Sequence, residues 1–170
     1  ISADGQTVAV GALDNDGAGN GAGHVRVFYF DGNDWIQIGT DIDGEMALDQ
    51  SGSSVNLSDD GSVVAIGAFG NDGAGSFAGH VRIFEWQPNG WVQVGTDIDG
   101  SSVGDSSGHS VALSGDGQLV AIGSPNWSDG GNGYLNGQVR VFTRESGAWV
   151  QVGQAVNSLD RYGYIGTAVS

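Results

Sequence analysis

Val8-Ala9-Val10-Gly11-Ala12 is the first of three short segments that the chain repeats, and their repetition decides the fold. The second segment is His24-Val25-Arg26-Val27-Phe28, and the third is Trp35-Ile36-Gln37-Ile38-Gly39. The copies lie at 8–12, 64–68 and 120–124, at 24–28, 80–84 and 138–142, and at 35–39, 91–95 and 149–153. Because position 64 follows position 8 by 56 residues, the repeat is about 56 residues long. A period of this order is typical of solenoids and propellers.

Each repeat contains four short segments with the character of strands. In the third copy they are 107–114, 119–122, 138–142 and 149–153, and Gly115-Asp116-Gly117 supplies a tight turn between the first two. We find no stretch with helical periodicity and caps. The sequence therefore predicts an all-β chain, a β-propeller of three four-stranded antiparallel blades. The predicted units are 1–56, 57–112 and 113–170.

The register of the repeats determines which strand edges of the chain are left without a partner. The sequence opens at a Ser-Asp-Gly turn, after the place of a first strand, and residues 162–170 resemble that strand. Residues 162–170 can therefore complete the first blade; the alternative is an arbitrary boundary within a longer array. Since propellers have about four to eight blades, three blades need a partner. We expect that partner to be the chain itself, as a homo-oligomer or as tandem repeats of a longer chain.

Composition excludes several classes of function. The chain has 20 acidic residues against five Arg and no Lys, which leaves no basic surface for nucleic acid. It has no cysteine, so disulfides and thiolate metal sites are excluded. No apolar run approaches the length of a transmembrane helix, so we expect no membrane insertion.

The repeats resemble the FG-GAP family of propeller repeats, in the variant found in secreted proteins of marine microbes. Residues 51–55 and 107–111 match the first element of that motif, and Gly123-Ser124-Pro125 matches the second. The resemblance, which extends distantly to integrin α-subunits, implies an extracellular, adhesive protein. It also implies Ca²⁺ in the first inter-strand loop, but the loops here are as short as Ala3-Asp4-Gly5. That calcium site is therefore not carried over.

A different loop is the best candidate for calcium. Asp14 and Asp16 lie two residues apart in a Gly-rich loop, and Ca²⁺ prefers several carboxylate oxygens. The simpler interpretation is a turn, because Asp bonds to the backbone and Gly adopts positive φ. No cofactor is certain, and Ca²⁺ at Asp14 and Asp16 stays an open alternative.

One arginine and one paired carboxylate motif recur in the blades. Arg26, Arg82 and Arg140 occupy one repeat position, and Asp41 and Asp43 are two residues apart, as are Asp97 and Asp99. A structural carboxylate–guanidinium bridge is the favoured interpretation over a metal site. Because a pair that recurs in successive blades indicates architecture rather than catalysis, we expect no enzymatic activity.

Repeated tryptophans suggest packing between blades. Trp35, Trp91 and Trp149 begin the fourth strand of each repeat, and such aromatic side chains bury large areas. The alternative is a lectin, in which exposed aromatic rings stack on sugars, and Trp127 and Tyr134 are then the candidate ligand-binding residues. Asn56 and Asn126 lie in sequons for N-glycosylation.

These observations together predict an extracellular, secreted or cell-surface module that mediates protein–protein assembly as part of a fibre, surface layer or adhesin. The alternative is a carbohydrate-binding propeller assembled from several chains, with extracellular glycans as its partners.

Overall fold

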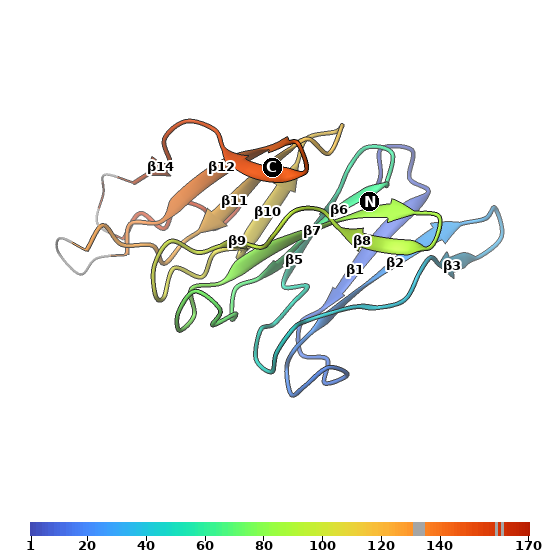
Figure 1. Cartoon of the computed structure of the whole chain (residues 1–170), viewed down its shortest axis with the longest axis horizontal. Coiled ribbons are helices and arrows are strands. Elements are labelled where there is room, and N and C mark those ends of the chain that lie inside the picture. Colours follow the sequence, from blue (N-terminus) through green and yellow to red (C-terminus); the bar gives the residue numbers. More distant parts are fainter. Residues whose placement is uncertain (131–134, 159, 161) are drawn as a thin grey trace.

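A computed structural model describes residues 1–130, 135–158, 160 and 162–170. Throughout these residues the chain forms strands, turns and loops, without a helix. The strands build three antiparallel sheets, which follow one another along the long axis of the molecule (Figure 1). The prediction of an all-β chain is confirmed.

Each sheet corresponds to one repeat of the sequence. Sheet one contains β1 (Thr7–Ala12), β2 (His24–Phe30), β3 (Trp35–Gln37) and β4 (Ile42–Asp43). Sheet two contains β5 (Ser54–Leu57), β6 (Val63–Ala68), β7 (His80–Gln87), β8 (Gly90–Gln93) and β9 (Ile98–Asp99). Sheet three contains β10 (Ser110–Leu113), β11 (Leu119–Ser124), β12 (Gln138–Glu145), β13 (Ala148–Gln151) and β14 (Val156–Asn157).

The fourth strand of every repeat is divided into two short strands. In sheet three, β13 pairs with the end of β12 and β14 pairs with its beginning, on the same edge. Gly153, at φ 66°, lies between them and turns the backbone out of the extended conformation. The second of these strands is not among the strands that the sequence predicts, and only two residues of it pair with the sheet.

The predicted Asp-Gly turns are present and are held by side chains. Gly61 adopts φ 71°, a value that favours glycine. Ser58 donates a hydrogen bond to Asp60 through its hydroxyl (2.7 Å) and accepts one from the amide of Val63 (3.0 Å). The same arrangement connects Ser114, Asp116 and Leu119 in sheet three.

The hydrophobic core lies between the sheets in two clusters. The first joins side chains of sheets one and two: Val25, Val27, Ile42, Leu57, Val64, Ile66 and Phe84. The second joins sheets two and three: Val63, Ala65, Val81, Ile83, Ile98, Val111, Val120, Ile122 and Phe142. Sheet two is therefore covered on both faces, whereas sheets one and three each have one face that no other sheet covers.

Glycines allow neighbouring sheets to approach closely. A Cβ on Gly67, in β6, would meet the carbonyl oxygen of Gly108, just before β10. Gly11 has the same relation to Gly52, and Gly123 has it to Gly166. The segment that leads into the first strand of a sheet, such as β5 or β10, therefore crosses the preceding sheet where two glycines meet.

Residues 162–170 begin like the entry to a further sheet. Ile165 forms a parallel bridge with Gly137, as Ser107 does with Gly79. The carbonyl of Gly166 accepts a hydrogen bond from the Ser110 hydroxyl (2.8 Å), and the Gly108 carbonyl accepts one from Ser54 (2.7 Å). These contacts place the segment against sheet three. Its completion of the first blade stays a prediction.

Candidate functional site

Polar side chains gather at one position in every repeat, at the beginning of the third strand. His24 and Arg26 lie there in β2, and His80 and Arg82 lie there in β7. Gln138 and Arg140 occupy the same place in β12. Side chains two residues apart in a strand point to the same face of the sheet. The two side chains of each pair therefore have the same neighbours.

In sheet one the arginine binds a carboxylate of its own repeat. Arg26 donates two hydrogen bonds to Asp41, at 2.9 Å from Nε and 2.8 Å from a terminal nitrogen. The hydrogen bonds from Arg26 and from Gln37 lower the pKa of Asp41 to about 2. This is the bridge that the sequence analysis favours over a metal site.

Arg82 and Arg140 differ from this expectation, because each contacts the preceding sheet. Arg82 donates a hydrogen bond to the backbone carbonyl of Asp43 (2.6 Å), and Arg140 donates one to the carbonyl of Asp99 (2.6 Å). No sheet precedes sheet one among the described residues, and Arg26 binds the carboxylate of its own repeat. The repeated arginine therefore connects consecutive sheets wherever two sheets meet.

Histidine and carboxylates come together at two of these positions. Nδ1 of His80 lies 3.8 Å from Asp97 and 3.9 Å from Glu45, and Nδ1 of His24 lies 3.6 Å from Asp41. The groups His24/Asp41/Asp43 and Glu45/His80/Asp97 are spaced closely enough to hold a metal ion. Each group also faces an arginine, which supplies the positive charge that these carboxylates need.

Asp14 and Asp16 belong to neither of these groups. Both side chains are exposed, and Oδ1 of Asp16 accepts a hydrogen bond from the amide of Gly21 (2.7 Å). Oδ1 of Asn15 accepts one from the amide of Gly17 (2.8 Å). The loop is thus closed by the kind of side-chain turn that the simpler interpretation predicts.

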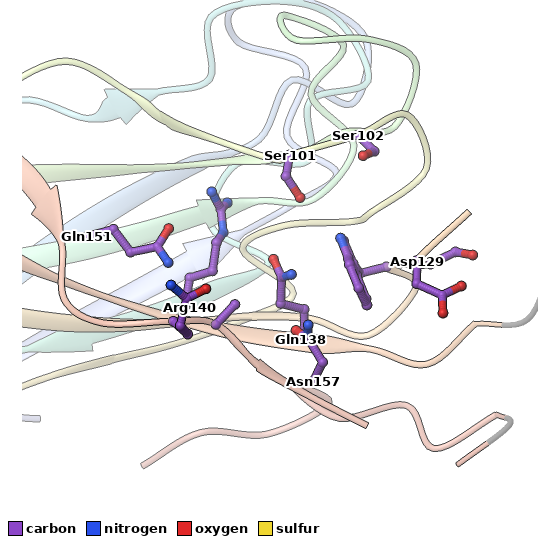
Figure 2. A pocket seen from close by; sticks show the side chains of 11 residues that line it. Ser101, Ser102, Asp129, Gln138, Arg140, Gln151 and Asn157 are labelled. Atoms are coloured by element: carbon purple, nitrogen blue, oxygen red, sulfur yellow. The ribbon is translucent and has the colours of Figure 1, made fainter. Parts of the chain in front are cut away.

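The third repeat has a pocket at this position instead of a charged cluster. The pocket has a volume of about 480 Å³ and lies where β12 and β14 face the loop after β9. Figure 2 shows Gln138 and Arg140 at its centre, with Ser101, Asp129 and Asn157 around them. Trp127 also lines it.

Three sequence differences surround this pocket, two of them in the third repeat and one in the loop after β9. Ser101 stands at the position of Glu45, Gln138 at that of His80, and Ala155 at that of Asp97. The replacements of Glu45 and Asp97 remove charge and side-chain volume, and that of His80 removes a titratable ring. Oε1 of Gln138 and Nε of Arg140 are buried without a hydrogen-bond partner among the described residues, as is Nε of Arg82 at the equivalent position of sheet two.

Trp127 occupies a turn position that the other repeats give to asparagine. Asn71 closes its turn by accepting a hydrogen bond from the amide of Gly73 (2.8 Å), as Asn15 does in sheet one. The backbone of Trp127 bonds to Ser124 (3.2 Å) just as that of Asn71 bonds to Ala68 (3.2 Å). The indole is therefore not needed for the turn and is free to line the pocket. Tyr134, the other residue of the lectin alternative, lies outside the described residues.

The two sequon asparagines are half-buried and hydrogen-bonded. Oδ1 of Asn56 accepts from the amide of Leu113 (2.8 Å), which joins β5 to β10. Nδ2 of Asn126 donates to the hydroxyl of Ser106 (2.9 Å). Both side chains thus take part in contacts between sheets two and three.

The repeated tryptophans join each sheet to the one before it. Nε1 of Trp91 donates to the carbonyl of Ile38 in sheet one (3.1 Å), and Nε1 of Trp149 donates to that of Val94 in sheet two (2.9 Å). Each indole also packs against the core cluster at its junction. Among the described residues no sheet lies before Trp35, which is 47% exposed.

The uncovered face of sheet one forms an apolar hollow. Val8, Val10, Phe28 and Trp35 line a depression of about 410 Å³ without polar surface. Their counterparts in sheet two are Val64, Ile66, Phe84 and Trp91, which lie in or against the core between sheets one and two. The same set of residues is therefore a packed junction in one repeat and an open surface in another.

Comparisons with known proteins support the fold only. No family model and no curated protein matches the chain. Among solved structures, a Bacteroides uniformis protein with the provisional name 6-phosphogluconolactonase is similar to 93% of the chain, with a TM-score of 0.55 and 17% identity. The tricorn protease is similar to 95% of the chain, with a TM-score of 0.47 and 11% identity. The chain spans 39% and 17% of those proteins, respectively. The first of these likenesses supports a propeller-like, all-β fold.

The pocket as a whole is not predicted from the sequence. The sequence differences that surround it are visible once the repeats are aligned, at Ser101, Gln138 and Ala155. The alignment does not show that the three positions lie around one point, because Gln138 begins β12, Ala155 precedes β14 and Ser101 follows β9 of the preceding repeat.

Proposed function

We propose that the chain is a structural or adhesive propeller module that acts outside the cell by assembling with further repeats of its own kind. The observation that carries this proposal is the apolar hollow of sheet one. Val10 is 48% exposed there, whereas its counterpart Ile66 is buried against sheet one. An uncovered surface made of junction residues is a surface for another sheet of this repeat.

The other end of the molecule supplies a surface of the right kind. Val139 and Val141 of β12 are half-buried, and Val156 of β14 is 58% exposed. Their counterparts Val81, Ile83 and Ile98 of sheet two are buried under sheet three, and Ile98 is only 5% exposed. One end of the chain therefore carries the first half of a junction, and the other end carries the second half.

A non-covalent role agrees with the chemistry of the repeats. The carboxylates that recur face arginines, as at Asp41 and Arg26, or lie beside backbone contacts between sheets. An extracellular location is supported by the resemblance to FG-GAP repeats. No helix in the described part of the chain is long and apolar enough to span a membrane.

The proposal is tested by placing a charge in the hollow. We expect Val10→Asp to abolish self-association, measured as native mass by sedimentation, because it buries an unpaired carboxylate in the junction. The matched control is Val150→Asp, because Val150 is similarly exposed at 43% and its counterparts Ile36 and Val92 are exposed in their own repeats. Equal association of both variants would contradict the proposal.

Saccharide binding is a second candidate function, and the pocket of the third repeat favours it. Sugar sites combine an aromatic ring with a few polar groups that fix orientation. Trp127 supplies the ring, and Gln138, Arg140, Asp129 and Asn157 supply donors and acceptors. The counterpart positions in sheet two hold a charged cluster instead.

A glycan array followed by calorimetry tests this second function. We expect a hit to lose at least tenfold in affinity in Trp127→Ala, because the stacking surface is removed. Trp86→Ala is the control, because Trp86 lies in β7, away from the pocket. An array without a saccharide-specific signal, or equal loss in both variants, would reject saccharide binding at this pocket.

A further inference from the structure

The junction between sheets one and two brings together three side chains that suit a transition metal ion. They are Glu45, which follows β4, His80 at the start of β7, and Asp97, which precedes β9. We propose that these three residues bind a divalent transition metal ion, with Zn²⁺ as the best fit, and that the ion links the two sheets. All three lie between residues 45 and 97, so the site needs no repeat outside the described chain.

The ligand atoms of the three side chains face one another. Nδ1 of His80 lies 3.8 Å from Oδ2 of Asp97 and 3.9 Å from Oε2 of Glu45, distances too long for hydrogen bonds. One ligand atom from each residue lies within 4.8 Å of the other two. Two ligand atoms of a tetrahedral Zn²⁺ lie about 3.3 Å apart at ordinary Zn–N and Zn–O distances. The side chain of Glu45 is 43% exposed and can move inward to reach such a distance.

His80 is the buried member of the site, and its ring has no hydrogen-bond partner. The side chain is 2% exposed, and Nε2 is buried without a partner among the described residues. Nδ1 points to the two carboxylates without a hydrogen bond to either. Buried polar side chains ordinarily have at least one partner, and a metal ion at Nδ1 supplies it. Imidazole is a ligand for zinc and similar ions, whereas Ca²⁺ and Mg²⁺ prefer oxygen ligands.

The arginine of sheet two leaves these carboxylates open, in contrast to the arginine of sheet one. Arg26 donates hydrogen bonds to both oxygens of Asp41. Arg82 instead donates to the carbonyl of Asp43, and its Nη1 lies 3.8 Å from Oε1 of Glu45, which is not a hydrogen bond. Oε2 of Glu45 therefore remains available to an ion.

The charges around the site favour a divalent cation. The charged groups that act on His80 include Asp97, Glu45 and Asp49 on one side and Arg82 on the other. Three carboxylates against one guanidinium leave two negative charges beside a neutral ring. Charge at a buried position is costly unless it is paired, and one divalent ion offsets both negative charges.

A glutamine holds Asp97 in the orientation that the site needs. Nε2 of Gln93 donates to Oδ1 of Asp97 (2.7 Å), while Oδ2 faces His80. Carboxylates that bind metal ions are commonly fixed by such a hydrogen bond. Gln151 holds the counterpart position in the third repeat, where Ala155 replaces the carboxylate, and it donates to a backbone carbonyl instead.

The third repeat lacks all three ligands together. Ser101, Gln138 and Ala155 stand at the positions of Glu45, His80 and Asp97, respectively. None of these replacements is a good ligand for Zn²⁺. Side chains that serve packing alone can be replaced one at a time, whereas the joint replacement of this set indicates that its members act together.

Titration of the metal-free chain with Zn²⁺, followed by calorimetry, tests the site. We expect one Zn²⁺ per chain, retained in an excess of Ca²⁺. His80→Gln and Glu45→Ser each introduce the residue of the third repeat, and we expect each to weaken Zn²⁺ binding at least about tenfold. The matched control is His24→Gln, because Arg26 already holds the carboxylate of Asp41 beside that histidine. This control is expected to bind Zn²⁺ like the unmodified chain.

Co²⁺ in place of Zn²⁺ provides a second measurement, because the visible absorption of bound Co²⁺ depends on its ligands. We expect the absorption bands in the unmodified chain and in His24→Gln, and their loss in His80→Gln. Circular dichroism checks that each variant folds, and Glu45→Ser, at an exposed side chain, still tests the site if His80→Gln does not fold. Binding of Zn²⁺ that is unchanged in His80→Gln or in Glu45→Ser, or that is lost equally in His24→Gln, would overturn the site.

Discussion

At the scale of single residues, His80 shows how a repeat can bury a titratable side chain. The side chain is 1% exposed, and this burial lowers the pKa of His80 below its usual value. The charges of Asp97 and Glu45 favour the protonated ring, while that of Arg82 opposes it. The net shift is downward, so the neutral ring is the form that the folded chain prefers.

We therefore expect the stability of the chain to fall as the pH drops below 6.5 in a way that depends on His80. Below that value the unfolded histidine binds a proton that the folded one resists, so the free energy of unfolding decreases by at most about 1.4 kcal/mol per pH unit from this group. His80→Gln, which introduces the residue of the third repeat, removes this contribution. Urea unfolding between pH 7.5 and 5 measures it at a fixed protein concentration.

The exposed His109 provides the control for this measurement. His109→Gln is expected to keep the pH slope of the unmodified chain, whereas His80→Gln is expected to flatten it. Identical slopes in all three proteins would mean that burial of His80 does not couple folding to pH.

At the scale of elements, the strands were predictable because each is short, apolar and bounded by glycine. The alternation in 107–114 and the apolar run at 119–122 correspond to β10 and β11. The divided fourth strand was not predictable, since Gly153 and its counterparts resemble the end of a strand rather than an interruption within one. The pairing of β14 with β12 involves only two residues, too few to give a sequence pattern.

The candidate site was predictable from the sequence only in part, because some of its residues form no pattern of their own. The sequence predicts Trp127 as a ligand-binding residue of the lectin alternative, and Trp127 lines the pocket. Gln138 and Ser101 are ordinary polar residues, and their meaning depends on what the other repeats hold at the same positions. The contact of Arg82 with the carbonyl of Asp43 involves a backbone atom, which no side-chain pattern reveals.

At the scale of the whole molecule, the three sheets form a stack with unlike ends. Trp35 and Val10 are exposed at one end, and Val152 and Val156 are exposed at the other. Their counterparts in other repeats are packed in the junctions between sheets. A repeat protein usually protects its ends with polar capping repeats. Here both ends of the described stack keep the junction residues, and under the proposed function they pack against further repeats.

The measurement that tests this account most directly is the native mass of the unmodified chain by light scattering, over a dilution series in 0.3 M salt. Assembly through these two ends predicts a mass above 17.3 kDa that approaches 17.3 kDa only at the lowest concentrations. A folded monomer of 17.3 kDa at every concentration would contradict the central claim that the two ends of the stack are halves of one junction.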